Sequence, residues 1–380
     1  MTRLELRNDV QLLRVIRVVR RDGRTAVRIV DVAVERFRTD LREPFVTALG
    51  VETTVDGLQV RISDSDGRVG LGEAVAATTV TGETPGSIED AVRGPLRSAV
   101  LGGRLDELEQ VLRSIELALP GNPSAKAALD IAVHDLWARW LDRPLHVLLG
   151  GARTEIVTDM TISLDEPEAM ASVAARRIAE GFGCLKVKLG GPPDMDLERV
   201  RAVRAVSDPT VAIRVDANQA WSTKQALMII KRFEEENLGV DLVEQPVRAA
   251  DLQGLARITA SVATPIMADE SCFSPEDALR LAGEHMADAL NIKLMKCGGL
   301  RSALAIVAIA EAAGIKCAVG CMMEGMVSAT AVACLAAGKS SISSIDLDAP
   351  LWLRTAERSG VATWNGERIR LGDAAGLGIS

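Results

Sequence analysis

The chain has 380 residues, 48% of them hydrophobic, and a formal net charge of −8 at pH 7. This size suffices for one large domain and a smaller one around a well-buried core, whereas the acidic balance argues against nucleic acid as the main partner. The six cysteines lack zinc-finger spacing and lie mostly in apolar runs, which is typical of reduced core thiols in a cytoplasmic protein.

Residues 1–26 form a basic stretch. Eight arginines occur within residues 1–30 with short apolar pairs between them, so the stretch lacks the uninterrupted apolar segment of a signal peptide or a membrane span. We interpret residues 1–26 as an extension that adds little to the fold, with a basic arm that binds an acidic surface as the alternative. No membrane partner is expected.

Residues 27–150 are predicted to form an α+β domain. Period-two patterns such as IVDVAVERF and GLQVRIS, which occur before Gly72, indicate antiparallel strands. From residue 87 to 149, apolar residues recur at three- and four-residue intervals, which indicates helices. The pair Gly150–Gly151 then marks the passage to the next domain.

Residues 151–353 are predicted to form a (β/α) barrel. Short apolar strands alternate there with amphipathic helices such as EPEAMASVAARRIAEG, and this alternation implies a parallel sheet. The available length fits eight strand–helix units. The remaining residues, 354–380, carry strand patterns, and we expect them to return to the first domain and complete it.

Five stretches of the predicted barrel end in charged residues at near-regular intervals. They are CLKVKLG, IRVDANQAW, DLVEQP, PIMADES and LNIKLMKCGG, and their key residues, 28, 28, 25 and 24 positions apart, are Lys188, Asp216, Glu244, Asp269 and Lys293. A strand, a helix and two loops use about that much chain, so each key residue is expected to end a successive strand. Five ionisable groups on neighbouring strand ends would share one mouth, which predicts an active site.

Lys186 and Lys188 are two residues apart on a predicted strand, so they face the same way. Because a barrel strand is covered on both faces, two lysines on one face fit only near the open mouth. There the ammonium group of Lys186 is expected to disfavour the charged form of Lys188, which would make Lys188 a usable base. The alternative is a solvated surface strand, against which the apolar flanking residues argue.

Three carboxylates, those of Asp216, Glu244 and Asp269, come from consecutive predicted strands. Clustered without compensation they would repel one another strongly. A hard divalent cation resolves the repulsion, and an all-oxygen site with room for water and a substrate carboxylate suits Mg²⁺. The alternative is that they serve as separate helix caps or surface ion pairs.

A metal that faces two lysines suggests proton abstraction next to a carboxylate. The α-proton is barely acidic, so the metal must stabilise the enediolate anion while a positioned lysine takes the proton. If Lys188 and Lys293 lie on opposite faces of the α-carbon, one removes a proton and the other returns it from behind. Such a reaction inverts the stereocentre.

The motifs resemble those of the enolase superfamily, in its muconate-lactonising subgroup, over nearly all of residues 27–380. The matching stretches are the K-x-K strand, DAN, VEQP, ADES, NIKLMKCGG and GCMMEG. The resemblance implies an α/β fold, a modified TIM (β/α)7β-type barrel under an N-terminal α+β capping domain. It also implies that Mg²⁺ is held by Asp216, Glu244 and Asp269. The mandelate racemase branch uses a barrel histidine as base, but His134, His146 and His285 all lie in apparent helices and suit core or surface positions.

The stretch SSIDLDAP narrows the resemblance to dipeptide epimerases, which carry a D-x-D here for the free α-amino group of the dipeptide. Asp346 lies 53 residues after Lys293, about two barrel units, and shares a face with Asp348. Two loop aspartates that cap the following segment are the alternative. Thr161 and Cys321 fall where such enzymes line the substrate pocket, and Lys186 is expected to contact the substrate carboxylate. Glu324 either orients a lysine or satisfies backbone donors.

The segments 42–50 and 76–86 resemble the two loops that close over the substrate in this family. Epimerases specific for Ala-Glu tend to carry an arginine where this chain has Gly50, so an apolar or cationic second residue is the prediction instead.

The resemblance thus implies a Mg²⁺-dependent isomerase that epimerises an L,L-dipeptide at the α-carbon of its second residue, by two-lysine 1,1-proton transfer through an enediolate. The alternatives on the same scaffold are a muconate-type cycloisomerase, an N-acylamino-acid racemase and an o-succinylbenzoate synthase, whose substrates lack the free ammonium group that a D-x-D would bind. Whether the chain forms a homo-oligomer stays open.

Overall fold

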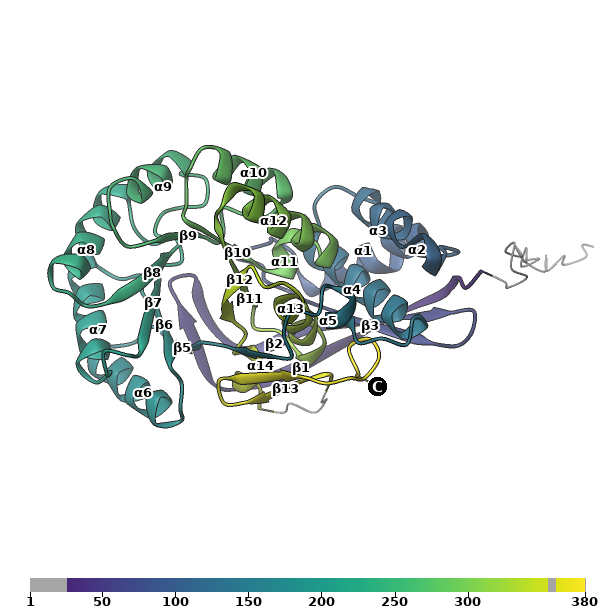
Figure 1. Ribbon diagram of the computed structural model, residues 1–380, viewed down its shortest axis with the longest axis horizontal. Coiled ribbons are helices and arrows are strands. Elements are labelled where there is room, and N and C mark those ends of the chain that lie inside the picture. The colour runs from purple at the N-terminus through teal and green to yellow at the C-terminus, as the bar shows by residue number, and fades with distance from the viewer. Residues whose placement is uncertain (1–25, 355–359, 380) are drawn as a thin grey trace, which may run out of the picture.

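The computed structural model describes residues 26–354 and 360–379. The predicted extension of residues 1–26 lies outside this range except for Ala26. The described chain forms an antiparallel sheet with its helices, an eight-stranded parallel barrel and a small third sheet (Figure 1). The division into domains at residues 150 and 353 remains a prediction.

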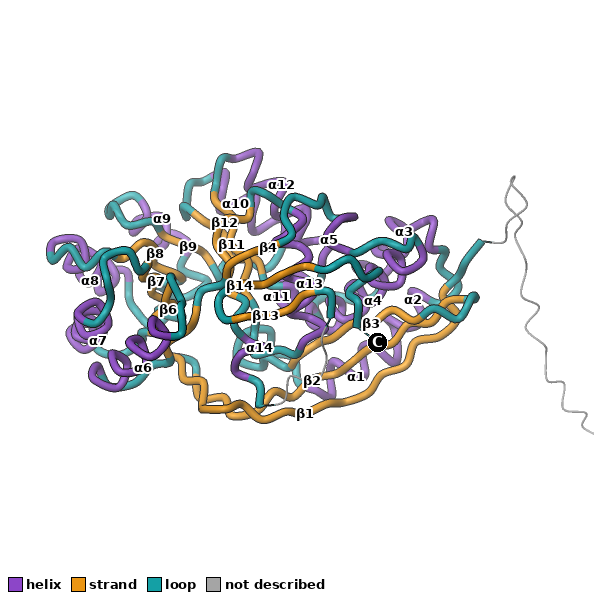
Figure 2. The backbone as a smooth tube through the Cα atoms, turned by 60° about the horizontal axis from the view of Figure 1, so that its bottom comes forward, coloured by secondary structure: helices purple, strands orange, loops and turns teal. Residues whose placement is uncertain are grey.

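The N-terminal sheet is dominated by a long hairpin. Its three antiparallel strands, in the order β1-β2-β3, are β1 (Ile29–Thr47), β2 (Gly50–Asp64) and β3 (Val69–Val75). In β2, buried residues alternate with exposed or half-buried ones from Leu58 onward, as the period-two pattern predicts for one covered face. Figure 2 shows β1 and β2 running most of the length of the molecule, from the N-terminal helices to the barrel strands.

Most of the segment 42–50 is strand and not loop, because β1 continues to Thr47 and β2 starts at Gly50. Pro44 obscures this continuation in the sequence, since proline cannot donate to a ladder. The chain accommodates it with a shift of register between Asp40 and Phe45. The second expected loop, residues 76–86, is found over residues 76–84, which contain no helix or strand, whereas Pro85 and Gly86 already belong to the next helix.

Seven helical segments follow β3. They are α1 (Pro85–Ala91), η1 (Val92–Leu96), α2 (Arg97–Val100), η2 (Leu105–Glu107), α3 (Leu108–Leu117), α4 (Pro123–Trp140) and α5 (Leu145–Leu148). The helical pattern that the sequence shows from residue 87 onward is interrupted at η1, where Gly94 leaves helical geometry before Pro95. Helix α4 is mostly buried and packs on β3 at Gly70 and Gly72. A Cβ at Gly72 would lie 1.8 Å from the carbonyl oxygen of Ala128, so only glycine allows this approach.

The barrel consists of eight parallel strands. They are β5 (Met160–Ile162), β6 (Cys184–Lys188), β7 (Ala212–Asp216), β8 (Val240–Glu244), β9 (Ile266–Ala268), β10 (Ala289–Ile292), β11 (Lys316–Gly320) and β12 (Ile342–Asp346). Neighbours in sequence are neighbours in the sheet. Between β12 and β5, the amide of Asp159 donates to the carbonyl oxygen of Ile345 at 3.0 Å.

Helices cover the outside of the barrel (Figure 1). They are α6 (Pro167–Ala179), α7 (Pro193–Ala205), α8 (Thr223–Glu235), α9 (Leu252–Thr259), α10 (Pro275–Gly283), α12 (Leu300–Ala313) and α13 (Met326–Gly338). Two short helices, α11 (Leu294–Cys297) and α14 (Ala349–Trp352), follow β10 and β12. Six strands are followed directly by a helix of at least eight residues, β10 is followed by the short α11 and then by the long α12, and β12 is followed only by the four-residue α14. The predicted (β/α)7β-type barrel with an N-terminal α+β unit is therefore confirmed.

The C-terminal segment forms a third sheet. Strands β13 (Ala362–Asn365) and β14 (Arg368–Leu371) make a hairpin that pairs with β4 (Glu155–Val157), in the order β13-β14-β4. Beyond this sheet, the amide of Leu377 donates to Asp135 Oδ1 on α4 at 2.7 Å. The tail thus contacts both the start of the barrel region and the N-terminal helices.

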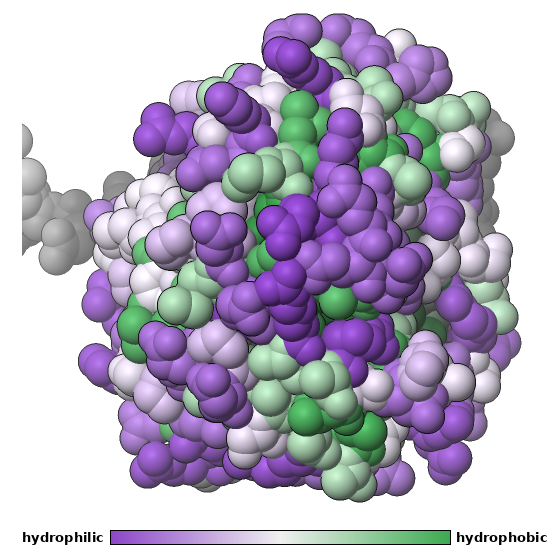
Figure 3. Space-filling model, turned by 90° about the vertical axis from the view of Figure 1, so that its left-hand side faces the viewer, coloured by the Kyte–Doolittle hydropathy of each residue, from purple (hydrophilic) through white to green (hydrophobic). Residues whose placement is uncertain are grey.

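The outer surface over the barrel helices is mostly hydrophilic, with apolar residues in small patches (Figure 3). Within residues 26–354 and 360–379, no helix combines the length and the apolar character that crossing a membrane requires.

Asp135 is expected to be a main stabilising residue of the N-terminal unit. Its buried carboxylate accepts from the amide of Leu71 on β3 at 2.8 Å and from the amide of Leu377 in the tail. Asp135→Ala leaves both amides without an acceptor and should lower the free energy of unfolding by about 2–4 kcal/mol. Denaturant unfolding would measure this change. The exposed Asp90 is the control, since Asp90→Ala should change stability by less than about 0.5 kcal/mol; equal effects of the two would contradict this role.

Candidate active site

The charged residues of the five motifs lie at the C-terminal ends of barrel strands. Strands β6, β7 and β8 end at Lys188, Asp216 and Glu244, and β9 and β10 are followed at once by Asp269 and Lys293. Because all eight strands are parallel, these ends meet at one mouth of the barrel. The sequence spacing therefore corresponds to one cluster in space.

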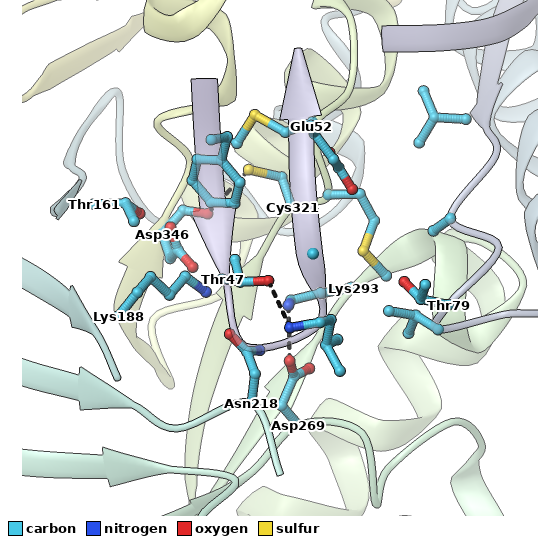
Figure 4. Close-up of a pocket in the computed structure, with 18 of the residues that line it drawn as sticks. Thr47, Glu52, Thr79, Thr161, Lys188, Asn218, Asp269, Lys293, Cys321 and Asp346 are labelled. Atoms are coloured by element: carbon cyan, nitrogen blue, oxygen red, sulfur yellow. Dashed lines mark hydrogen bonds and ion pairs between the residues drawn. The ribbon is translucent and has the colours of Figure 1, made fainter. Parts of the chain in front are cut away.

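A cavity of about 230 Å³ lies between this mouth and the N-terminal sheet. Its outer wall, here called the lid, consists of residues 45–52 at the tip of the β1–β2 hairpin and residues 75–80 after β3. Figure 4 shows the hairpin tip reaching toward the lysines. All predicted site residues line the cavity except Asp216 and Glu244. These two carboxylates contact Lys186, which lines the cavity.

The ammonium group of Lys186 joins three carboxylates. Its Nζ lies 2.7 Å from Glu244 Oε2, 2.7 Å from Asp346 Oδ2 and 3.2 Å from Asp216 Oδ2. Lys188 Nζ lies 2.7 Å from the same Asp216 oxygen. Instead of facing each other uncompensated, as the sequence interpretation assumed, Lys186 and Lys188 share a counter-ion.

A second group of ion pairs surrounds Asp269. Lys293 Nζ donates to Asp269 Oδ2 at 2.8 Å, and Lys296 Nζ lies 2.6 Å from Oδ1. Asn291 donates from Nδ2 to Glu244 Oε1 at 2.8 Å. The sequence interpretation missed Lys296 and Asn291, although Asn291 lies two residues before Lys293 and so shares its face at the strand end.

These contacts set the protonation of the cluster. Burial alone would raise the pKa of Asp216, but Lys188 and Lys186 lower it to about 2. Burial and the neighbouring Asp216 raise the pKa of Glu244, although Lys186 acts in the opposite direction. For Lys293, burial disfavours the charged form, but the pair with Asp269 outweighs it and the pKa is raised.

Asp216, Glu244 and Asp269 suit a divalent cation by the chemistry of their donors. All three are buried, and Asp216 and Glu244 are direct neighbours in the β7–β8 register. In the part of the chain described here, no three acidic, histidine or cysteine side chains lie close enough together to hold a metal as they stand. Lysine ammonium groups are the counter-charges of all three carboxylates. Three anionic oxygen donors on successive strands are nevertheless the ligand type of Mg²⁺, and they could hold it if the lysines withdraw.

The two aspartates of the D-x-D motif both line the cavity. Asp346 ends β12 and pairs with Lys186, whereas Asp348 Oδ2 accepts from the amide of Thr161 at 2.8 Å and from Trp352 Nε1 at 2.9 Å. Although Asp348 precedes α14, its side chain makes no capping hydrogen bond to that helix. Cys321 lies beside this pair, with its Sγ 3.3 Å from the carbonyl oxygen of Asp346.

The lid brings further residues to the cavity. Lys188 Nζ lies 5.7 Å from the centre of the Phe45 ring, over its face. Gly50 and Glu52 line the cavity from β2, two residues apart and so on one face of the strand. Phe45 lies in the segment 42–50 that the sequence predicts to close over the substrate, whereas Glu52 lies outside that segment and was not predicted.

The remaining candidates lie away from the cavity. Glu324 is buried, and burial together with Glu73 raises its pKa well above the ordinary value, but it does not line the cavity. His134 is buried on α4, with its Nδ1 2.8 Å from the carbonyl oxygen of Asp130, and His146 is buried on α5. His285 was expected in a helix but lies two residues past the end of α10.

Two family models match the chain. The model described as "Mandelate racemase / muconate lactonizing enzyme, N-terminal domain" matches residues 29–150. The model described as "Enolase C-terminal domain-like" matches residues 169–380. Together they cover the lid-bearing N-terminal unit and most of the barrel.

Relatives match over nearly their whole length. The L-Ala-D/L-Glu epimerase of Clostridium acetobutylicum is 41% identical over 351 residues, which are 92% of this chain and 98% of the relative. The substrate-liganded L-Ala-D/L-Glu epimerase from Bacillus subtilis superimposes with a TM-score of 0.91 at 42% identity, covering 93% of this chain and 98% of that chain.

A third similar structure is the dipeptide epimerase from Methylococcus capsulatus, solved with Mg and the dipeptide L-Arg-D-Lys. It superimposes with a TM-score of 0.87 at 34% identity, covering 93% of this chain and 99% of that chain. The chain therefore belongs to the mandelate racemase/muconate lactonizing enzyme family of the enolase superfamily, in which these relatives are epimerases.

Proposed function

We propose that this enzyme epimerises an L,L-dipeptide at the α-carbon of its second residue, in a Mg²⁺-dependent 1,1-proton transfer. The observation that carries the proposal is the placement of Lys188 and Lys293 in one cavity, above three buried carboxylates. The relatives support the substrate class, since they are named as dipeptide epimerases and two of their structures hold a substrate or dipeptide.

Lys188 and Lys293 act as the two acid/base groups. They come from β6 and from the end of β10, with β7, β8 and β9 between these strands, so they reach the cavity from different sides (Figure 4). A neutral lysine takes the α-proton from one face of the carbon, and the ammonium group of the other lysine donates a proton to the opposite face. The stereocentre is inverted and the two lysines have exchanged protonation states, which proton exchange with solvent restores before the next turnover.

Asp216, Glu244 and Asp269 would hold Mg²⁺, and the Methylococcus capsulatus structure solved with Mg supports the choice of metal. When bound, Mg²⁺ would supply the positive charge that stabilises the enediolate form of the substrate. Lys186 lies between Glu244, Asp216 and Asp346, where its ammonium group can contact the substrate carboxylate.

Asp346 and Asp348 bind the free ammonium group of the dipeptide. Both carboxylates face the cavity, and hydrogen bonds from Thr161 and Trp352 fix the second one. Thr161 and Cys321 form the wall beside them. The cycloisomerase, N-acyl racemase and o-succinylbenzoate synthase alternatives are disfavoured, because their substrates carry no free ammonium group that would compensate the half-buried Asp346 and the buried Asp348.

Lys188→Ala and Lys293→Ala are each expected to lower the rate of epimerisation by at least about 10³-fold, because each removes one partner of the proton transfer. Circular dichroism of dipeptide solutions measures the change of configuration. Each variant should still exchange the α-proton with D₂O in one diastereomer only, since the opposite lysine survives. Normal epimerisation in either variant would refute the two-lysine scheme.

Asp346→Asn and Asp348→Asn are expected to act mainly on KM for dipeptides, raising it about tenfold or more through loss of a charge-assisted contact with the ammonium group. Steady-state kinetics would measure this. N-acetylation of the dipeptide should abolish the difference between wild type and variants. An enzyme that prefers the N-acetylated substrate would indicate the N-acyl racemase alternative instead.

Removal of divalent cations is expected to abolish α-proton exchange, and added Mg²⁺ should restore it. Isothermal titration calorimetry should also detect Mg²⁺ binding to the wild type, and Glu244→Gln should weaken it by about tenfold or more through loss of one anionic ligand. Full exchange in metal-free buffer, or Mg²⁺ binding unaffected by this substitution, would argue against the assigned ligands.

A further inference from the structure

Among the described lid residues that line the cavity, only one has a charged side chain. Along the hairpin tip the lining residues are aromatic, apolar, hydroxyl-bearing or glycine except for Glu52, and the segment after β3 contributes only valine, alanine and threonine. The barrel side, in contrast, is rich in both lysines and carboxylates. A charge in the lid therefore acts on whatever part of a substrate reaches toward the hairpin.

The carboxylate of Glu52 has no counter-ion of its own. Within residues 26–354 and 360–379 it forms no hydrogen bond or ion pair, whereas Asp216, Glu244, Asp269 and Asp346 are each paired with a lysine. Its backbone is held in the β1–β2 ladder opposite Phe45. The side chain of Glu52 is exposed, yet desolvation beside the cavity raises its pKa, and the charges of Lys188 and Lys293 act against this rise. Glu52 is thus an accessible carboxylate on a backbone held by the ladder, and it lacks a cation.

Gly50 leaves space next to this carboxylate. It lies two residues before Glu52 on the same strand and lines the same cavity. A Cβ built at Gly50 would meet no atom within 4 Å, so the strand leaves an open path at this point. Figure 4 shows Glu52 on the hairpin, away from Thr161 and Asp346. A side chain that extends from the cavity past Gly50 can therefore reach Glu52.

We propose that Glu52 selects dipeptides whose second residue carries a cationic side chain, of the lysine or arginine type. This inference rests on the proposed function, which puts the α-carbon of the second residue between Lys188 and Lys293. The first residue is then anchored by Asp346 and Asp348, away from Glu52, so the second side chain is the one that passes Gly50. A glutamate in that position would meet the negative charge of Glu52 and lack an arginine partner at Gly50.

The test compares L-Ala-L-Arg with L-Ala-L-citrulline, which has nearly the same shape without the charge. We expect the wild type to favour the arginine dipeptide by about tenfold or more in kcat/KM, and Glu52→Gln to remove most of that preference. Glu35→Gln is the matched control, because Glu35 is an exposed carboxylate on β1 that does not line the cavity. It changes the net charge equally and should keep the preference.

Charge reversal provides a second readout. Glu52→Lys should shift the ratio of kcat/KM toward L-Ala-L-Glu and away from L-Ala-L-Arg. Equal rates for the arginine and citrulline dipeptides in the wild type, or a preference unchanged in Glu52→Gln, would overturn the role of Glu52. A stronger preference for L-Arg-L-Ala than for L-Ala-L-Arg would overturn the assigned position.

Measurements on a neutral dipeptide distinguish a failure of the Glu52 role from a failure of the proposed epimerase activity. Exchange of the α-proton in L-Ala-L-Leu without any preference for cationic side chains would leave the epimerase proposal intact and refute the role of Glu52. Absence of exchange in all of these dipeptides would refute both.

Discussion

Mutual compensation of buried charges at the barrel mouth is the constraint on which the site depends. Four lysines meet there with the carboxylates of Asp216, Glu244, Asp269 and Asp346, and each of these four carboxylates has an ammonium nitrogen within 2.8 Å. A buried charge without a partner costs several kcal/mol, so these groups are stable only as a set. The parallel barrel makes the set possible, because successive strands end at the same mouth. The same compensation explains how three clustered carboxylates are stable without a metal cation, because lysine ammonium groups supply the positive charge.

The two parts of the molecule contribute differently to the cavity. The barrel supplies the ionisable groups, each fixed at a strand end. The N-terminal unit supplies the lid, which carries one charged residue, Glu52, among the described residues that line the cavity. Under the proposed function, a substitution in the lid would change which side chain is accepted without disturbing the ion pairs. The close packing of α4 on β3, which Gly72 permits, helps to hold the sheet that carries this lid.

The sequence predicts the barrel side of the site well and the lid side poorly. The positions of strand-end residues such as Asp216 and Glu244 can be predicted, because a strand–helix unit has a nearly constant length. Regular spacing in the sequence therefore implies that these residues share one mouth of the barrel. Spacing does not predict the contact of Lys296 with Asp269, because Lys296 lies on α11, which begins directly after β10, and not at a strand end. The position of Glu52 in the cavity wall is not predicted either, because it depends on where the long β1–β2 hairpin packs. The local hydrophobic pattern of the strands carries no information on that packing.

The measurement that tests the account most directly is mass spectrometry of L,L-dipeptide pools incubated with the enzyme and Mg²⁺ in D₂O. Proton transfer at the α-carbon predicts a gain of one mass unit, located in the second residue, for those dipeptides that the cavity accepts. Their D-configured second residues should appear together with the label. Absence of deuterium across a broad library, with the folded enzyme and Mg²⁺ present, would contradict the assignment of dipeptide epimerisation to this site.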